Sequence, residues 1–121
     1  MNILMLDDHQ DYMALFQKWC AATHPESPVI CLGNEEALLR RIDFLPPDVI
    51  LLDVFMEGRN GFQIARDIRA RPDGRTFKIF LLTGIDGDLV IDDDGNLEGV
   101  DGFLSKSLGF KRIMEKIGAS K

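Results

Sequence analysis

The chain has 121 residues, of which 45% are hydrophobic, and it carries a formal net charge of −6 with a pI near 4.8. This length and apolar content are enough for one folded core, which argues against a disordered chain, and we expect a single domain over residues 1–121. The acidic balance disfavours nucleic acids and anionic membranes as partners, and no apolar run approaches the roughly 20 residues of a membrane span, so we expect a cytoplasmic protein.

Apolar runs alternate with segments of helical period, a pattern typical of an α/β domain with a parallel sheet. The first strand is expected at residues 3–6 and the second at residues 29–32. The helix between them is expected to bury Met13, Phe16 and Cys20. A second helix should begin after Asn34 as its N-cap and stop at Pro46-Pro47. Its inner face is predicted to hold Ala37, Leu38, Ile42 and Leu45.

The third predicted strand, residues 49–52, is so apolar that it should be buried on both faces of the sheet. Strands at residues 78–82 and 102–105 complete the set. A helix after the third strand should bury Phe62, Ala65 and Ile68. A helix after the fifth strand should bury Phe110, Ile113, Met114 and Ile117.

The segment between the fourth and fifth strands departs from the pattern. A crossover helix is expected there, but residues 84–101 contain four glycines and six aspartates, and each glycine costs a helix about 1 kcal/mol relative to alanine. We therefore predict that residues 84–99 form a degraded helix, a loop or a small hairpin, and that they are the least ordered part of the domain. The aspartates do not have the spacing of a calcium-binding loop. If Asp92, Asp94 and Asn96 were the first three ligands, Leu97 would stand where the loop requires a glycine.

Polar side chains follow four of the five predicted strands: Asp7 and Asp8, then Asp53, Thr83 and Lys106. Ligands of open α/β sheets bind at the carboxyl ends of the strands, where these side chains should meet. Carboxylates held together repel each other unless a cation lies among them, and Mg²⁺ prefers carboxylates, waters and a phosphate. A lysine and a hydroxyl suit a phosphoryl group. The pattern favours Mg²⁺-assisted transfer of a phosphoryl group onto a carboxylate.

With these residues, the whole chain resembles a receiver domain of two-component response regulators, similar to the chemotaxis regulators. The resemblance is carried by Ile3-Leu4-Met5-Leu6-Asp7-Asp8, Asp53 with Met56 and Gly61 after it, Thr83, and Gly102-Phe103 before Lys106. It implies a flavodoxin-like fold. In that fold a single doubly wound, five-stranded parallel sheet of order 2-1-3-4-5 carries helices on both faces.

The resemblance also implies the roles of the site residues. Asp53 would accept the phosphoryl group from a histidine kinase or a histidine phosphotransfer protein, and Thr83 and Lys106 would contact it. Thr83 and Phe103 would form the switch that signals phosphorylation to a downstream effector protein. Such a module is not an enzyme in the usual sense.

The implied cofactor is Mg²⁺. Its ligands would be Asp8, Asp53 and the backbone carbonyl of Phe55, with Asp7 supporting the ion through a water molecule.

Three positions depart from the family's usual pattern. Ser107 stands where a proline commonly follows the lysine, so the Lys106-Ser107 peptide is expected to be trans. Glu57 stands where a proline is usual four residues after the phospho-acceptor. The third departure is the segment 84–99, which in relatives forms part of the output surface.

Two other functions remain open from the sequence. A pseudo-receiver would use the same fold as an interaction module without phosphorylation. A small-molecule Mg²⁺ phosphohydrolase is disfavoured, because Phe55 stands where aspartate-nucleophile phosphatases carry a second aspartate.

The remaining candidates have structural explanations. His9 is expected on the rim of a loop and His24 in a turn, neither with a metal-binding partner at helical spacing. Arginines at 66, 69, 71 and 75 are interleaved with acids and are expected to form a solvated helix face.

Overall fold

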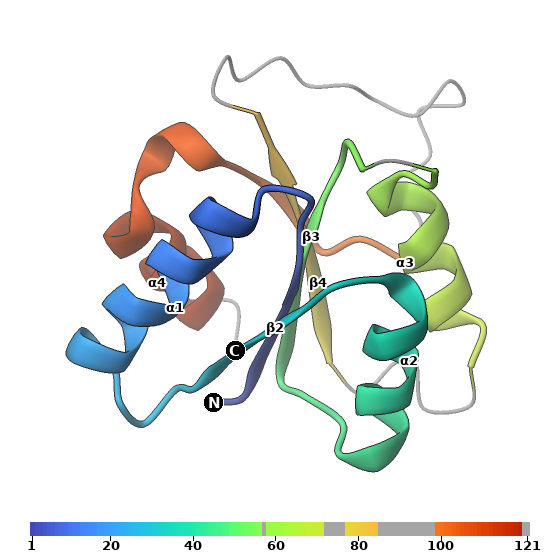
Figure 1. The fold of residues 1–121 in the computed structure, drawn as a ribbon, viewed down its shortest axis with the longest axis horizontal. Coiled ribbons are helices and arrows are strands. Elements are labelled where there is room, and N and C mark those ends of the chain that lie inside the picture. Colours follow the sequence, from blue (N-terminus) through green and yellow to red (C-terminus); the bar gives the residue numbers. More distant parts are fainter. Residues whose placement is uncertain (57, 72–76, 85–98, 120–121) are drawn as a thin grey trace.

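The computed structural model describes residues 1–56, 58–71, 77–84 and 99–119 (Figure 1). Its strands are β1 (Ile3–Leu6), β2 (Val29–Leu32), β3 (Val49–Asp53), β4 (Lys78–Thr83) and β5 (Gly102–Ser105). Its helices are α1 (Gln10–Thr23), α2 (Glu35–Phe44), α3 (Gly61–Arg69), the short 3₁₀ helix η1 (Lys106–Leu108) and α4 (Phe110–Ala119). The five strands form one parallel sheet in the order β2-β1-β3-β4-β5, which confirms the predicted topology. The predictions for residues 85–98 and for Glu57 lie outside the described residues.

Helices cover both faces of the sheet, as predicted (Figure 1). Successive strand residues point to opposite faces, so each strand supplies two separate apolar clusters. Ile3 and Met5 belong to the cluster beneath α1 and α4, whereas Leu4 and Leu6 belong to the cluster beneath α2 and α3. Among the described helices, none combines the length and the hydropathy that crossing a bilayer requires.

The bounds of α2 follow the prediction, because it begins after Asn34 and ends before Pro46, but one residue of its predicted inner face does not. The Asn34 side chain accepts a hydrogen bond from the backbone N–H of Ala37 at 2.8 Å, as an N-cap should. Leu38 and Ile42 are buried, but Leu45 is 46% exposed, so its predicted place on the inner face is wrong. The helix ends one residue earlier, and the extended backbone of Leu45 no longer follows the helical period.

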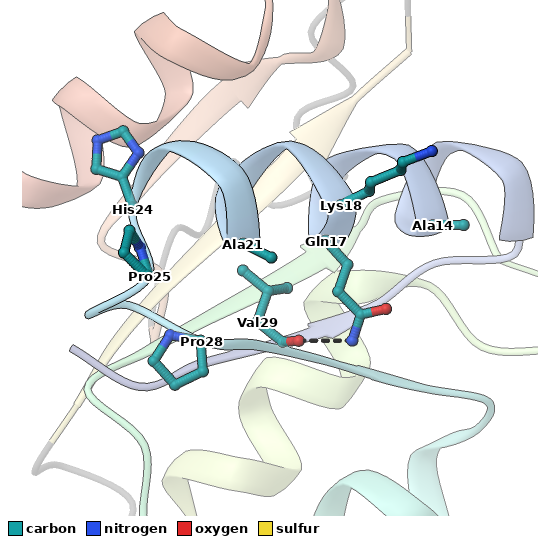
Figure 2. Close-up of a pocket in the computed structure, with 8 residues that line it drawn as sticks. All are labelled: Ala14, Gln17, Lys18, Ala21, His24, Pro25, Pro28 and Val29. Carbon is teal, nitrogen blue, oxygen red and sulfur yellow. Dashed lines mark hydrogen bonds between the residues drawn. The ribbon is translucent and has the colours of Figure 1, made fainter.

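Among the described strands, β2 lies at the edge of the sheet and pairs only with β1. Gln17 on α1 donates a hydrogen bond from Nε2 to the carbonyl oxygen of Val29 at 2.8 Å (Figure 2). The bond lies beside a pocket of about 550 Å³ between α1 and β2, and none of the residues lining that pocket is an acid. The acidic site is therefore elsewhere.

Candidate functional site

Three side chains from separate strands meet where the strands end. Asp7 follows β1, Asp53 closes β3, and Lys106 follows β5. Both aspartates are buried, and the Lys106 side chain is only 7% exposed. Its Nζ lies 2.6 Å from Asp7 Oδ2 and 3.8 Å from Asp53 Oδ2. The ammonium therefore offsets the charge of both acids but contacts Asp7 more closely.

Within the described part of the chain, one oxygen of Asp53 has no hydrogen bond. Its Oδ1 accepts a weak bond from the backbone N–H of Phe55 at 3.4 Å, whereas Oδ2 is buried and accepts none. Burial, and then repulsion from Asp7, raise the pKa of Asp53 to about 6, although Lys106 opposes the shift. A buried carboxylate in this condition is stabilised by a cation, by protonation or by a covalent partner.

Gly61 allows the loop after β3 to return close to Asp53. A Cβ atom at this position would lie 2.7 Å from the Asp53 carbonyl oxygen and 3.0 Å from Leu81 Cδ2. The Gly61 N–H donates to the Val54 carbonyl at 3.0 Å. The helix α3 begins at this glycine, so its first turn is held against the end of β3.

A pocket of about 520 Å³ opens beside Asp53. Its lining residues are His9, Asp11, Tyr12, Leu15, Asp53, Phe55, Gly84 and Lys106. Leu15 is 58% exposed and Phe55 56%, so large apolar side chains flank the acids. Lys106 Nζ lies 4.7 Å from the centre of the Tyr12 ring, a cation–π contact that helps to orient the lysine.

His9 belongs to this site, which the sequence analysis did not predict. Its Nδ1 lies 3.0 Å from Asp7 Oδ1, 3.7 Å from Asp53 Oδ2 and 3.2 Å from Lys106 Nζ. Potential ligand atoms of Asp7, His9 and Asp53 all lie within 4.8 Å of one another. The imidazole is 68% exposed, which agrees with the expected loop rim. Its partners come from β1 and β3, so helical spacing could not reveal them; its place directly after two strand-end acids could have.

Other predicted site residues lie outside this group. Asp8 is exposed and lines a separate pocket of about 240 Å³ that also includes Arg59. Thr83 is buried at the end of β4, where it pairs with Ser105 of β5. Phe103 is half-buried, and its ring centre lies 5.8 Å from that of Phe62.

Ser107 is accommodated by a local cap. Its backbone N–H, which a proline would lack, donates to Ser105 Oγ at 3.2 Å, and the two hydroxyls lie 2.7 Å apart. The described residues contain no cis peptide bond, so the Lys106-Ser107 peptide is trans, as expected.

A family model for the response regulator receiver domain matches residues 3–118. The chain, with its parallel sheet and its acidic pocket, therefore belongs to the receiver domain family. Members of this family are signalling domains of two-component systems rather than conventional enzymes.

Individual relatives agree with this assignment. The response regulator PleD of Caulobacter vibrioides is 31% identical over 109 residues, which is 88% of this chain but only 23% of PleD. The fold matches the response regulator TrrA of Thermotoga maritima in complex with Mg²⁺-BeF, with a TM-score of 0.74, 23% identity and coverage of 98% and 96% of the two chains. A structure of histidine kinase ThkA in complex with TrrA matches with a TM-score of 0.78, 24% identity and the same coverage.

Proposed function

We propose that residues 1–121 form one phosphorylatable receiver domain, located in the cytoplasm, in which Asp53 accepts a phosphoryl group. The donor is a histidine kinase or a histidine phosphotransfer protein. The observation that supports this most strongly is the state of Asp53, which is buried at the end of β3 with Oδ2 unbonded and an ammonium group 3.8 Å away.

The chemistry follows from the charges of the site. At a pH above its pKa of about 6, Asp53 is ionised and acts as the nucleophile. A bond forms between its oxygen and phosphorus as the bond between phosphorus and the donor histidine nitrogen breaks. Lys106 turns from Asp7 toward the phosphoryl group and stabilises the charge on its oxygens, and the Thr83 hydroxyl contacts the same group.

The residues present fit Mg²⁺. The site offers carboxylate oxygens, and Asp53 Oδ2 is buried without a hydrogen-bond donor. Asp8, Asp53 and the Phe55 carbonyl would hold the ion, and Asp7 would support it through a water molecule. Bound Mg²⁺ supplies positive charge that the phosphoryl oxygens share with Lys106.

This set of ligands predicts which of the two acids after β1 contributes more to Mg²⁺ binding. Asp8→Ala should weaken Mg²⁺ binding severely and Asp7→Ala less, because a group acting through water contributes less than a direct ligand. Calorimetric titration with Mg²⁺ compares the two variants with the wild type. Equal losses of affinity would contradict the ranking.

The output is proposed to be contact with a downstream effector protein. Thr83 and Phe103 are the proposed switch, and the exposed Leu15 and Phe55 provide apolar surface beside the site for an approaching partner. Segment 84–99 is proposed to become ordered on phosphorylation, which hydrogen exchange with and without beryllofluoride would test.

Intact-mass measurement after incubation with acetyl phosphate and Mg²⁺ tests the central claim. The wild type should gain one phosphoryl group and Asp53→Asn none. A gain that persists in Asp53→Asn would assign the phosphate to another residue. If acetyl phosphate and histidine kinases all leave the wild type unmodified, the domain is a pseudo-receiver.

A further inference from the structure

We infer that His9 is a nitrogen ligand of the divalent cation at this site, and that it shifts the cation preference from Mg²⁺ toward a first-row transition-metal ion such as Mn²⁺ or Zn²⁺. The inference deepens the proposed function and rests on its cation site. It assigns to His9 a role in metal specificity.

The ring of His9 is oriented by Asp7. Asp7 Oδ1 lies 2.8 Å from the His9 backbone nitrogen, which donates to it, and 3.0 Å from His9 Nδ1. The same aspartate oxygen thus fixes both the backbone and the imidazole of His9. Nδ1 is thus directed toward the two carboxylates, and a metal ion bound to it would take the place of the proton through which Nδ1 donates to Asp7.

The spacing of the potential ligands fits one metal ion. Ligand atoms at about 2.1 Å from a common metal lie about 3.0 to 4.2 Å from one another, for adjacent and opposite positions of an octahedron. His9 Nδ1 lies 3.7 Å from Asp53 Oδ2, which is within this range, whereas Asp7 Oδ1, at 3.0 Å from Nδ1, belongs to the group proposed to support the ion through water. Among the side chains of the described part of the chain, only Asp7, His9 and Asp53 bring potential ligand atoms within 4.8 Å of one another.

A second observation points to a ligand independently of the acidic cluster. Asp53 is 2% exposed, and its Oδ2, the oxygen nearest to His9 Nδ1, accepts no hydrogen bond from the residues that the structure describes. The nearest positive charge, on Lys106, lies closer to Asp7 and to His9 than to this oxygen. A divalent ion between Asp53 and His9 would supply the missing partner.

The types of ligand atom, oxygen or nitrogen, decide which divalent cation the site prefers. A site built from oxygens alone suits Mg²⁺, whereas imidazole nitrogen favours transition-metal ions, which bind it more strongly than hard cations do. Replacing one oxygen ligand by the His9 nitrogen therefore raises the affinity of the site for transition-metal ions. Two carboxylates remain to bind either Mg²⁺ or a transition-metal ion.

Electron spin-echo envelope modulation of bound Mn²⁺ tests the inference, because it detects a coordinated ¹⁴N nucleus directly and needs no phosphorylation. The chain has two histidines, so His24→Gln is a matched control for His9→Gln. The wild type and His24→Gln should show the nitrogen modulation and His9→Gln should lose it. By calorimetry, His9→Gln should weaken Mn²⁺ binding about tenfold or more and Mg²⁺ binding less than about threefold.

Several results would overturn the inference: no Mn²⁺ binding, no nitrogen modulation in the wild type, modulation that persists in His9→Gln, or equal losses of Mn²⁺ and Mg²⁺ affinity. Acetyl phosphate labelling of Asp53 is measured separately. A nitrogen signal without labelling by acetyl phosphate or by any histidine kinase refutes the proposed function alone, and labelling without a nitrogen signal refutes this inference alone. His9 is 68% exposed, so its replacement should leave the fold intact.

Discussion

The two ends of the parallel sheet both carry aspartates, but they satisfy them differently. At the amino end, where the strands begin, Asp48 Oδ2 accepts the backbone N–H of Asn2 at 2.7 Å. Asp101 Oδ2 accepts the backbone N–H of Ile79 and pairs with Arg69, each at 2.7 Å. Both residues are exposed, and their carboxylates also have hydrogen-bond partners within the fold.

At the carboxyl end, Asp7 and Asp53 are more deeply buried, yet Asp53 Oδ2 accepts no hydrogen bond and the pKa of Asp53 is raised. The comparison indicates that a candidate functional acid is one that is buried and also lacks hydrogen-bond partners. An aspartate whose oxygens are satisfied stabilises the fold, whereas one with a buried, unsatisfied oxygen is available for a ligand.

The largest expected effect is at the amino end. Asp101→Ala removes the partner of the Ile79 N–H and of Arg69, whose guanidinium also donates to the carbonyls of Gly99 and Phe77. We expect a loss of about 2 to 3 kcal/mol in the free energy of unfolding, measured by urea denaturation. Glu115→Ala, at an exposed position on α4, is the control. An unchanged midpoint for Asp101→Ala would remove the distinction between the two ends.

At the carboxyl end the expected change has the opposite sign. The pKa of Asp53 is about 6 in the folded state and near 3.9 when unfolded, so ionisation lowers stability as pH rises through this interval. Asp53→Asn should raise the free energy of unfolding on the order of 2 kcal/mol near pH 7.5 without divalent cations. The gain should shrink toward about pH 4, where wild-type Asp53 is protonated in the folded protein. Urea denaturation at both pH values measures it, and a pH-independent gain would argue against the raised pKa.

Adding Mg²⁺ should separate the two ends further. At a concentration tenfold above its dissociation constant, a ligand that binds only the folded state stabilises by about 1.4 kcal/mol. The wild type and Asp101→Ala should gain this increment equally, because Asp101 is not a proposed ligand, and Asp53→Asn should gain little. Thermal unfolding with and without Mg²⁺ gives the comparison. A full increment in Asp53→Asn would place the cation elsewhere.

The smallest effect is expected for Asp48→Ala. The substitution removes the exposed hydrogen bond from Asn2, while the backbone bond from the Asp48 N–H to the Asn2 carbonyl remains. We expect a loss of about 1 kcal/mol or less by urea denaturation. A loss as large as that of Asp101→Ala would show that the Arg69 network is not what distinguishes Asp101.

The sequence predicted the parts of the site that depend on strand order. An acid after an apolar strand lies at the carboxyl end of any parallel sheet, so the approach of Asp7, Asp53 and Lys106 followed from the strand pattern alone. Their separations and the unbonded Asp53 Oδ2 depend on side-chain packing, which a strand pattern does not contain.

Contacts between distant segments were missed for the same reason. Arg69 was expected on a solvated helix face, but its side chain is 18% exposed and bonds to residues 8 to 32 positions along the chain. Helical periodicity places an arginine on a face, and only the fold shows what that face meets. His9 joined the site through partners on two strands in the same way.

The hydrogen bond from Gln17 to Val29 also affects how copies of this domain meet each other. An edge strand presents free carbonyl and N–H groups on which another chain can extend the sheet and begin aggregation. Here β2 has only four residues, and its Val29 carbonyl is already occupied by Gln17 of α1. An incoming strand must break an internal bond before it can pair, so this side chain protects the edge of the sheet against association between molecules.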